Sequence, residues 1–587
     1  MPGAGPEPHA RTGPAFSNMP RIVTRAAPPD RELALVRQGV PALLARIYAA
    51  RGIAAASELA HPIDGLLPVE PLRNVDAIAV ILADAIRDGR RLLIVADYDA
   101  DGATGCAVGV RALRAFGAEV DYLVPNRFDY GYGLTPEIVR IAAERKPNSI
   151  ITVDNGIASV EGVAEAKRLG IDVLVTDHHL PGTLLPDALC IVNPNQAGCA
   201  FPSKCMAGVG VMFYVMLALR AELRRRGAFA SRGEPNLAQL LDLVALGTVA
   251  DVVRLDRNNR ILVHQGLRRI RAGKASSLVR ALFREAGREP MRASTSDLGF
   301  VAGPRLNAAG RLQDMSLGID GLTTDDETLA ADIARQLNGL NRERREIEAG
   351  MQETALAALE EPRDPASFSL VLFDPGWHQG VIGILASRLK DRFHRPVIAF
   401  AQGANGELKG SGRSIPGLHL RDALDLVAKR HPGLILRFGG HAAAAGLSIS
   451  AYHLEDFAAA FEETVRGLLT PADLEQLIEI DGSLPAEEAT LDVADALEQE
   501  PWGQGFPAPA FFDAFEVVDQ RIVGGRHLKL RLGRGRRSFG CILFGRTDPV
   551  PKEIRAVYRL AVNEFNGSRT LEVRLDHWTP LADPAWT

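Results

Sequence analysis

Cysteine is scarce in this 587-residue sequence: the five cysteines are irregularly spaced and include no Cys-x-x-Cys pair. This pattern excludes a disulfide framework and a four-cysteine zinc site, and it indicates a reducing compartment. Long apolar runs are also missing, since the longest, residues 205–219, is shorter than the ~20 residues that a membrane span requires. We therefore expect a buried helix there and a cytoplasmic protein that is not associated with a membrane.

An excess of charge of one sign is absent as well. The sequence has 67 Lys and Arg against 72 Asp and Glu, a net charge of −5, and 47% hydrophobic residues. These values are typical of folded globular proteins, and the length predicts several domains. The first 30 residues contain seven prolines and no apolar core of a secretory signal. They are predicted to form a disordered tail.

Short apolar runs alternate with helical periodicity after about residue 90, where residues 91–96, 120–124, 150–153 and 171–176 are separated by predicted helices. This alternation is typical of a parallel α/β sheet. Residues 326–360 have the pattern of one long connector helix, and a second, smaller α/β domain is predicted for 361–470. The pattern of residues 471–587 indicates short strands and a β-barrel. The first α/β domain would occupy residues 31–325 and begin with two or three helices in 31–90.

Acidic residues and histidines follow the predicted strands of the first domain. The first strand ends in Asp97-Tyr-Asp99-Ala-Asp101-Gly102, the third in Asp154, and the fourth in Asp177-His178-His179. Parallel strands place their carboxyl ends at one edge of a sheet, where ligands bind. Asp251, after an apolar helix, is a further candidate for the same edge.

Crowded carboxylates repel one another unless a cation neutralises them. Oxygen ligands with one or two imidazoles suit Mn²⁺ or Mg²⁺ better than zinc, and two ions about 3.5–4 Å apart can hold the attacking and leaving oxygens of a phosphodiester. Each motif alone has another interpretation: Asp-Ala-Asp-Gly is also a helix N-cap, and a His-His pair is often a surface or core feature. From the residues alone, which histidine binds metal stays open.

The motifs together resemble the DHH phosphoesterase superfamily, and within it the bacterial exonucleases that degrade single-stranded DNA from 5′ to 3′. The resemblance extends from Leu43 to the C-terminus and includes ordered blocks at 97–102, 152–156, 177–179, 247–251, 303–311, 380–389, 410–414 and 439–446. It implies that the metal ligands are Asp99, Asp101, Asp154, His178 and Asp251, and that Asp97 and His179 are catalytic.

The same resemblance implies contacts with a terminal phosphate of the substrate. Arginine guanidinium groups suit such contacts because they bind phosphate with two parallel hydrogen bonds. The second domain resembles the DHH-associated domain, which would contribute through its Ser411–Arg413 and Gly439–His441 blocks. The predicted phosphate-binding residues are Arg127, Arg305, Asn307, Arg311, Ser411, Arg413, Gly440 and His441.

Residues 521–546 carry eight Arg or Lys and no Asp or Glu. Basic strands with interleaved aromatic residues, here Phe539 and Phe544, are typical of oligonucleotide-binding barrels. A solvated hairpin with core phenylalanines is the alternative. The predicted contacts with single-stranded DNA are Arg526, Lys529, Arg531, Arg534, Arg536 and Arg537, with Arg526 and Leu528 on one face of the strand and His527 and Lys529 on the other.

The sequence therefore predicts a metal-dependent 5′→3′ exonuclease of single-stranded DNA that acts in recombination and repair and releases mononucleotides. A phosphodiesterase of very short or small substrates is one alternative, and a non-catalytic DNA-binding scaffold is another. The resemblance implies a single-strand-binding protein and a helicase as partners, and we expect a monomer.

Overall fold

The computed structural model describes residues 20–126, 133–231, 233–360, 366–565 and 568–582. Its contacts divide into two compact units. The larger unit contains residues 25–342 and 481–581, and the smaller unit contains residues 343–480 together with a strand near the N-terminus. Each unit is thus assembled from segments that are far apart in the sequence.

The N-terminal segment adopts regular structure earlier than the sequence predicted. Residues Arg21–Thr24 form β1, which pairs in parallel with β12 (Leu477–Ile480), and α1 (Pro29–Arg37) begins with a proline in its first turn. The predicted disordered tail is therefore wrong for residues 20–30, because the partner strand lies more than 450 residues away in the sequence. Residues 1–19 lie outside the described part of the chain.

Two further helices, α2 (Ala42–Ala49) and α3 (Val75–Arg87), complete the predicted helical segment before residue 90. Two short 3₁₀ turns, η1 (Ala56–Glu58) and η2 (Ile63–Gly65), lie between them. One face of α3 is buried and includes Ile78 and Leu82, as its helical periodicity predicts.

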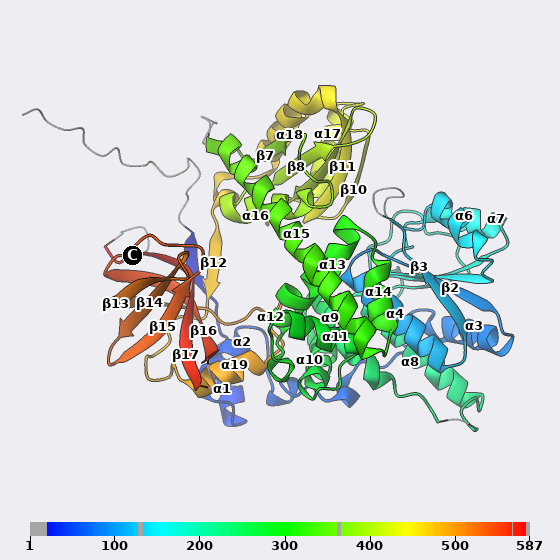
Figure 1. Ribbon diagram of the computed structural model, residues 1–587, viewed down its shortest axis with the longest axis horizontal. Coiled ribbons are helices and arrows are strands. Elements are labelled where there is room, and N and C mark those ends of the chain that lie inside the picture. The colour runs from blue at the N-terminus through cyan, green and yellow to red at the C-terminus, as the bar shows by residue number, and fades with distance from the viewer. Residues whose placement is uncertain (1–19, 127–132, 232, 361–365, 566–567, 583–587) are drawn as a thin grey trace, which may run out of the picture. The chain divides into compact units, whose positions relative to one another are not determined.

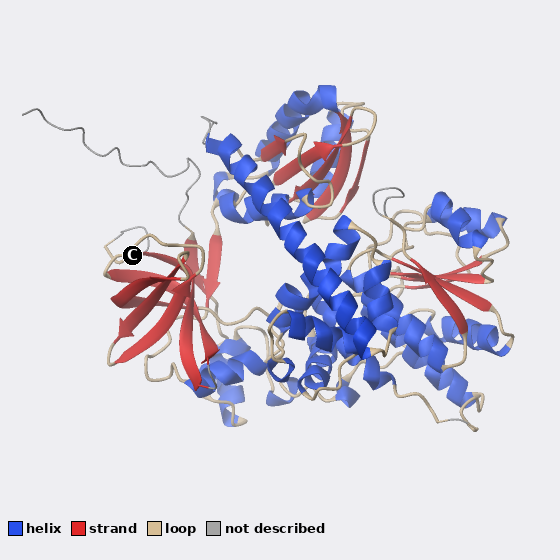
Figure 2. Ribbon diagram, viewed as in Figure 1, coloured by secondary structure: helices blue, strands red, loops and turns tan. Residues whose placement is uncertain are grey.

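The predicted parallel α/β sheet is confirmed. Its five strands lie in the order β3-β2-β4-β5-β6 and every neighbouring pair is parallel. Figure 2 shows the sheet as red strands with blue helices beside it. The central strand is buried along its whole length, which explains its continuous apolar sequence. The elements are β2 (Arg91–Ala96), α4 (Ala100–Ala115), β3 (Glu119–Leu123), α6 (Pro136–Glu144), β4 (Ser149–Val153), α7 (Val160–Arg168), β5 (Asp172–Thr176) and β6 (Cys190–Val192).

The register of this sheet aligns the ends of three strands. Ala96 of β2 pairs with Val153 of β4, and Val153 pairs with Thr176 of β5. Each of these residues is followed by an aspartate, so Asp97, Asp154 and Asp177 leave the sheet in one row. The backbone N–H groups of Asp97 and Asp154 still donate to the neighbouring strand, to Val153 and Thr176 respectively. The sheet therefore fixes the starting point of all three acidic loops.

Helices between residues 208 and 323 complete the first α/β domain. The apolar run 205–219 forms most of α8, which is buried from Gly208 to Met216, as predicted. Among the last helices of this group, α13 contacts both α9 and α4. The elements are α8 (Gly208–Arg225), η3 (Leu237–Leu240), α9 (Leu241–Ala250), α10 (Arg257–Arg271), α11 (Ser277–Glu285), η4 (Pro290–Arg292), α12 (Thr295–Asp297), the π-helix η5 (Leu298–Ala302), α13 (Gly303–Leu312) and α14 (Ser316–Thr323).

The long helix that the sequence predicted is α15 (Glu327–Glu360), a single helix of 34 residues. Figure 1 shows it as one continuous green ribbon. The chain leaves the larger unit within this helix, between residues 342 and 343.

The smaller unit contains a five-stranded mixed sheet in the order β10-β11-β9-β8-β7. Only β7 and β8 pair in parallel. Gly- and Ala-rich residues in this unit form the antiparallel strands β10 and β11. The elements are β7 (Leu370–Phe373), α16 (Ile382–Phe393), β8 (Val397–Gln402), β9 (Glu407–Arg413), α17 (Leu420–Arg430), β10 (Arg437–Gly440), β11 (Ala444–Ser450), η6 (Ala451–His453), α18 (Leu454–Leu468) and η7 (Pro471–Leu474).

The C-terminal strands form a closed five-stranded barrel in the order β13-β14-β15-β17-β16. The barrel is confirmed, but three of its strands have 13 residues each and are longer than expected. A helix, α19 (Leu491–Gln499), precedes it. The strands are β13 (Phe511–Val523), β14 (His527–Arg534), β15 (Arg537–Leu543), β16 (Glu553–Phe565) and β17 (Ser568–Pro580).

The segment before the barrel packs on the first helices of the chain. Both terminal guanidinium nitrogens of Arg51 donate to Asp481, at 2.7 and 3.0 Å, and Tyr48 stacks on Trp502 with ring centroids 6.0 Å apart.

None of the helices in the described part of the chain combines the length and apolar character of a membrane span.

A pair of packed histidines lies in the same region and makes folding stability depend on pH. The rings of His61 and His264 are 4.9 Å apart. Burial, and then the neighbouring His61 and Arg271, lower the pKa of His264 to about 4. His264 therefore stays neutral in the folded chain at pH values where it is protonated in the unfolded chain, so stability is lost as pH falls from about 6.5 towards 4.

We predict that the melting temperature of H264Q falls less than that of the wild type between pH 7 and pH 5, measured by differential scanning fluorimetry. The control is H453Q, which changes an exposed histidine and should keep the wild-type pH dependence. Equal acid sensitivity of H264Q and the wild type would contradict the assignment.

Candidate metal centre

Seven predicted site residues meet at the carboxyl edge of the parallel sheet. They form three overlapping groups, and the potential ligand atoms within each group lie within 4.8 Å of one another. Asp154 and His178 each belong to two groups, so the three groups are parts of one centre. The groups are Asp154, His178 and His179; Asp101, His178 and Asp251; and Asp97, Asp99 and Asp154.

His178 lies in the middle of the carboxylates. Its Nε2 is 3.0 Å from Oδ1 of Asp154, 3.6 Å from Oδ2 of Asp251 and 3.9 Å from Oδ2 of Asp101. The three aspartates come from a strand end, the end of α9 and the first turn of α4, which are separated by up to 150 residues in the sequence. Tertiary folding therefore brings them to one nitrogen atom.

The loop that carries Asp154 is bent sharply. Asp154 has a φ of +62°, a left-handed conformation that few non-glycine residues adopt but that aspartate tolerates. The first residue of α8, Gly208, lies against this carboxylate: a Cβ atom on Gly208 would be 2.7 Å from the Cβ of Asp154. Any larger residue at 208 would therefore displace Asp154 from the centre.

Asp99 has both roles that the sequence left open. Its Oδ1 accepts hydrogen bonds from the backbone N–H groups of Asp101 and Gly102, at 2.9 and 3.0 Å, so it is the N-cap of α4. It also belongs to the group with Asp97 and Asp154. The cap thus fixes the orientation of a potential ligand.

Asp101 is held by the N-terminus of α8. Its two oxygens accept hydrogen bonds from the N–H groups of Gly208 at 2.6 Å and Val209 at 2.8 Å. A helix N-terminus stabilises a negative charge, which offsets part of the cost of burying this carboxylate.

Helix α13 holds the same acidic loop from the other side, and the sequence did not reveal this role. The side-chain oxygen of Asn307 accepts a hydrogen bond of 2.7 Å from the N–H of Ala100. A Cβ on Gly310 would lie 1.9 Å from the carbonyl oxygen of Tyr98, so the helix can approach only because residue 310 is glycine. The block at residues 303–311 therefore positions Asp99 and Asp101.

Asp177, which was not among the predicted site residues, positions the histidine pair. Its Oδ1 is 2.8 Å from Nδ1 of His179 and accepts hydrogen bonds from the N–H groups of His178 and His179. Its Oδ2 accepts a hydrogen bond from the N–H of Ile157. The place of Asp177 in the row of strand ends was the signal that could have identified it.

Two asparagines that follow β6 fix the backbone of the histidines. Asn193 donates to the carbonyl of His179 at 2.9 Å, and Asn195 donates to the carbonyl of His178 at 2.6 Å. No sequence pattern singles them out, because their role depends on β6 lying next to β5.

The pKa values of the centre reflect burial and mutual repulsion. Burial, and then repulsion from the neighbouring aspartates, raise the pKa of Asp154 and of Asp251 well above the usual range, and burial with repulsion from Asp99 raises the pKa of Asp101 to about 7. Burial lowers the pKa of His179, but the hydrogen bond and charge of Asp177 outweigh it and raise that pKa overall. A positive charge inside the cluster would relieve this repulsion.

The donor set fits a divalent cation. Oδ2 of Asp251 is buried and has no hydrogen-bond partner among the described residues, which is costly unless another group binds it. Five carboxylates and two imidazoles within this small region are the ligands that Mn²⁺ and Mg²⁺ accept.

The described residues of the predicted phosphate-binding set belong to both units. Arg305 is 9% exposed and donates to the carbonyl of Val301 and to Asn338, and Arg311 is half-buried on the same helix. In the smaller unit, Arg413 donates to Ser411 at 3.2 Å, and His441 follows Gly440, whose φ is +139°. Arg127 lies outside the described residues.

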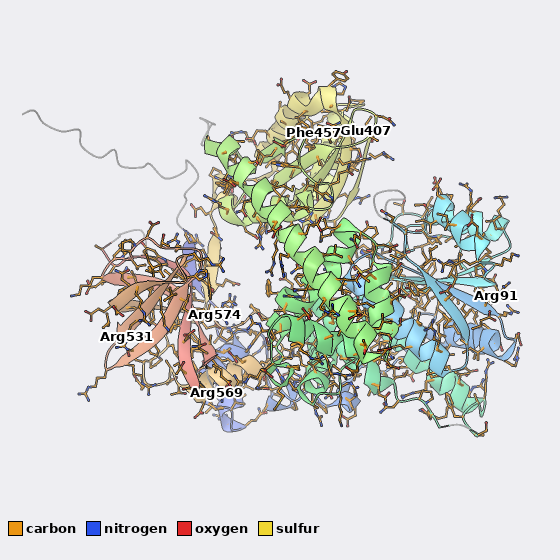
Figure 3. All side chains as sticks on the ribbon, in the orientation of Figure 1. Arg91, Glu407, Phe457, Arg531, Arg569 and Arg574 are labelled. Carbon is orange, nitrogen blue, oxygen red and sulfur yellow. The ribbon has the colours of Figure 1, made fainter. Side chains whose placement is uncertain are left out.

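The predicted DNA-binding residues of the barrel do not all lie where the sequence predicted. Leu528, Leu530 and Leu532 face the core, so Lys529 and Arg531 face outwards with His527, and Arg526 lies in the turn before β14 rather than on the face of Leu528. Figure 3 labels Arg531 at the outer surface of the barrel. Arg536 lies in the exposed turn before β15, and Arg537 donates to the carbonyl of Ala489.

Arg534 is held by the barrel itself. Its guanidinium donates to Asp513 at 2.6 Å and to Tyr558 at 3.3 Å, and it also contacts the carbonyl of Leu484. These contacts give Arg534 a structural role, and its part in DNA binding stays a prediction. Phe539 is 5% exposed and packs in the core, as the alternative interpretation held, whereas Phe544 is 74% exposed.

Comparison with known proteins agrees with this architecture. Three family models match the chain: the DHH family N-terminal domain over residues 91–248, the DHHA1 domain over 367–467, and the RecJ OB domain over 480–577. The chain is 53% identical to the single-stranded-DNA-specific exonuclease RecJ of Dickeya dadantii and 50% identical to that of Escherichia coli. Both alignments cover 92% of this chain and 96% of the relative.

Solved structures of RecJ from Thermus thermophilus share the fold. The complex with Mn²⁺ is 31% identical, with a TM-score of 0.80 over 96% of this chain and 80% of that one. The complex with Mg²⁺ gives a TM-score of 0.74 at 30% identity, over 96% of this chain and 78% of that one. From its three matching domains and from relatives of 50% identity and more over nearly their whole length, the chain belongs to the RecJ family.

Proposed function

We propose that this chain is a metal-dependent exonuclease that degrades single-stranded DNA from 5′ to 3′ and releases mononucleotides. The observation that carries the proposal is the cluster of five aspartates and two histidines at the sheet edge, in a chain at least 50% identical to single-stranded-DNA-specific exonucleases. The Mn²⁺ and Mg²⁺ complexes of the Thermus relative support the choice of ion.

The residues proposed to hold two Mn²⁺ or Mg²⁺ ions are Asp99, Asp101, Asp154, His178 and Asp251. Such ions, when bound, supply charge stabilisation to both the attacking and the leaving oxygen of a phosphodiester. The chain contributes a rigid arrangement: Asp99 is fixed by its cap, Asp101 by the N-terminus of α8, and Asp154 by its contact with Gly208.

His179 and Asp97 are proposed to act on the substrate itself. Asp177 holds Nδ1 of His179, which leaves the opposite ring nitrogen to donate a proton to a phosphate oxygen or to a leaving oxygen. Asp97 is 7% exposed and stands at the start of the same loop as the ligands Asp99 and Asp101. The role proposed for its carboxylate is to orient the attacking water.

We propose that a set of arginines, together with small and polar residues, binds the terminal 5′ phosphate. This contact would make degradation start at the 5′ end. The set is Arg127, Arg305, Asn307, Arg311, Ser411, Arg413, Gly440 and His441. Arg305 and Asn307 already have structural partners, so their proposed part is mainly to hold α13. Arg311 and Arg413 are proposed to bind the phosphate oxygens with paired guanidinium hydrogen bonds.

The barrel is proposed to bind the strand behind its 5′ end, through Arg526, Lys529, Arg531, Arg534, Arg536 and Arg537. Lys529 is the cross-strand neighbour of Arg521, so the basic surface continues onto β13. The exposed Phe544, 5.2 Å from the ring of His527, offers a face for base stacking.

By resemblance, we propose that the enzyme acts as a monomer in the bacterial cytoplasm, in DNA recombination and repair. Long single strands arise when duplex DNA is unwound. A helicase and a single-strand-binding protein are therefore the proposed partners. A barrel that binds a single strand along its length favours long substrates over dinucleotides.

The metal ligands are tested by D154N and H178N, with D172N as the matched control at the opposite end of the sheet, on the exposed first residue of β5. We expect the first two variants to lose at least about a hundredfold in cleavage rate, because a lost ligand removes several kcal/mol of charge stabilisation. DNA binding by anisotropy in EDTA should persist. Wild-type cleavage by D154N, or thermal stabilisation of D154N by Mn²⁺ equal to that of the wild type, would contradict the assignment.

The role of Asp177 is tested by D177N. Because the amide cannot hold His179 in the same protonation state, we expect kcat to fall about ten- to a hundredfold with little change in KM. An H179A variant should be equally impaired, and the double variant should lose no more than either single variant. Fully additive losses would show that the two residues act independently.

Polarity and substrate are tested with single strands labelled at either end, incubated with Mn²⁺, Mg²⁺ or EDTA beside a duplex control. We expect immediate release of labelled mononucleotide from the 5′ end only, with metal only and on single strands only. Binding without cleavage would favour a scaffold, and cleavage confined to dinucleotides would favour a small-substrate phosphodiesterase.

A further inference from the structure

We propose that Phe300 stacks on a base of the substrate strand beside the metal centre and so positions the strand for cleavage. The inference rests on the proposed function, since it concerns how the same site holds single-stranded DNA. Phe300 is one of three aromatic side chains among the described residues that are at least 74% exposed, with Tyr452 and Phe544.

The local sequence explains the widened turn that carries Phe300. Pro304, in the first turn of α13, has no N–H and cannot donate to the carbonyl of Phe300, four residues earlier. The preceding turn widens into the π-helix η5 (Leu298–Ala302). Such widened turns are rare and often lie at functional sites. An aromatic side chain that is 75% exposed on this turn gains little from burial, so folding does not account for it.

The widened turn is also held firmly. NH1 of Arg305 donates to the carbonyl of Val301 at 2.8 Å, and its Nε donates to Asn338 of α15 at 3.1 Å. Ser294 and Asp297 form a reciprocal cap at the start of α12, directly before the turn. Phe300 is therefore presented by a rigid element, which reduces the entropy lost when a base packs against it.

The turn contacts the helix that ends at a metal ligand. A Cβ on Gly299 would be 3.4 Å from Cγ1 of Val249, and a Cβ on Gly303 would be 3.1 Å from the Cβ of Ala250. Residues 249 and 250 directly precede Asp251, whose carboxylate lies 3.6 Å from Nε2 of His178. The two glycines that flank this turn, on either side of Phe300, thus contact the helix that ends at Asp251.

The other end of the same segment reaches the barrel. Arg292 forms an ion pair with Glu564 of β16, and the neighbouring Met291 is 76% exposed. The segment 291–303 therefore connects the barrel, which is proposed to bind the strand, with the helix that carries Asp251. Figure 1 shows α12 and α13, on either side of this turn, in the green part of the chain.

A nucleobase is the occupant that these observations favour. The bases of a single strand have free faces that stack on aromatic rings whatever their sequence, and arginines supply the accompanying contacts with phosphates. Residues 292–311 include three arginines, at 292, 305 and 311, and one acidic residue, Asp297, which is used in the cap. A protein partner on this surface would leave DNA binding unaffected by changes at Phe300.

The test compares F300A, F300L and F300W with Y452A, which removes an exposed aromatic residue from the smaller unit. Binding of a single strand is measured by anisotropy in EDTA, and cleavage is measured with Mn²⁺. We expect F300A to weaken binding and raise KM about tenfold, in line with the loss of one stacked base. F300W should retain wild-type values, F300L should resemble F300A, and Y452A should be unaffected.

The stacked base is located with strands that carry 2-aminopurine at successive positions from the 5′ end, because stacking quenches its fluorescence. We expect quenching at one position near the 5′ end that F300A abolishes and F300W restores. Wild-type binding by F300A, wild-type KM of F300L, or equal losses in F300A and Y452A would overturn the inference. If the wild type itself neither binds nor cleaves single strands, the proposed function fails instead.

Discussion

The crowding of carboxylates at one edge of a parallel sheet is the constraint that shapes the rest of this structure. Asp97, Asp154 and Asp177 leave three adjacent strands in the same row because the register of the sheet aligns Ala96, Val153 and Thr176. Buried acidic groups so close together raise one another's pKa values and destabilise the fold unless something compensates. Much of the surrounding structure supplies that compensation.

The groups that neutralise or bind each buried carboxylate differ. This difference distinguishes carboxylates that could bind a metal ion from those that hold other residues in place. Asp177 accepts hydrogen bonds from three backbone N–H groups and contacts His179, so its charge is satisfied within the protein. Asp101 receives two N–H groups from a helix N-terminus. Oδ2 of Asp251, by contrast, has no donor among the residues that the structure describes, which makes a cation the natural partner.

Close packing of helices against the acidic loops also holds the carboxylates in position. Gly208 and Gly310 lie where a Cβ would collide with Asp154 or with the carbonyl of Tyr98, so α8 and α13 can approach the loops and hold them. The proline that follows Gly303 widens the turn before α13 and exposes Phe300. One helix therefore both fixes the acidic loop and, in our proposal, presents a surface to the DNA.

Local periodicity was enough to predict the parallel sheet, the long helix and the barrel, and the rule that parallel strands end at one edge was enough to predict the acidic cluster. Which polar residues serve as supports became clear only from the folded chain. The roles of Asp177, Asn193, Asn195 and Asn307 depend on contacts between distant segments or on the exact register of neighbouring strands. The same reason explains the error at the N-terminus: β1 needed a partner at residues 477–480, which local sequence cannot reveal.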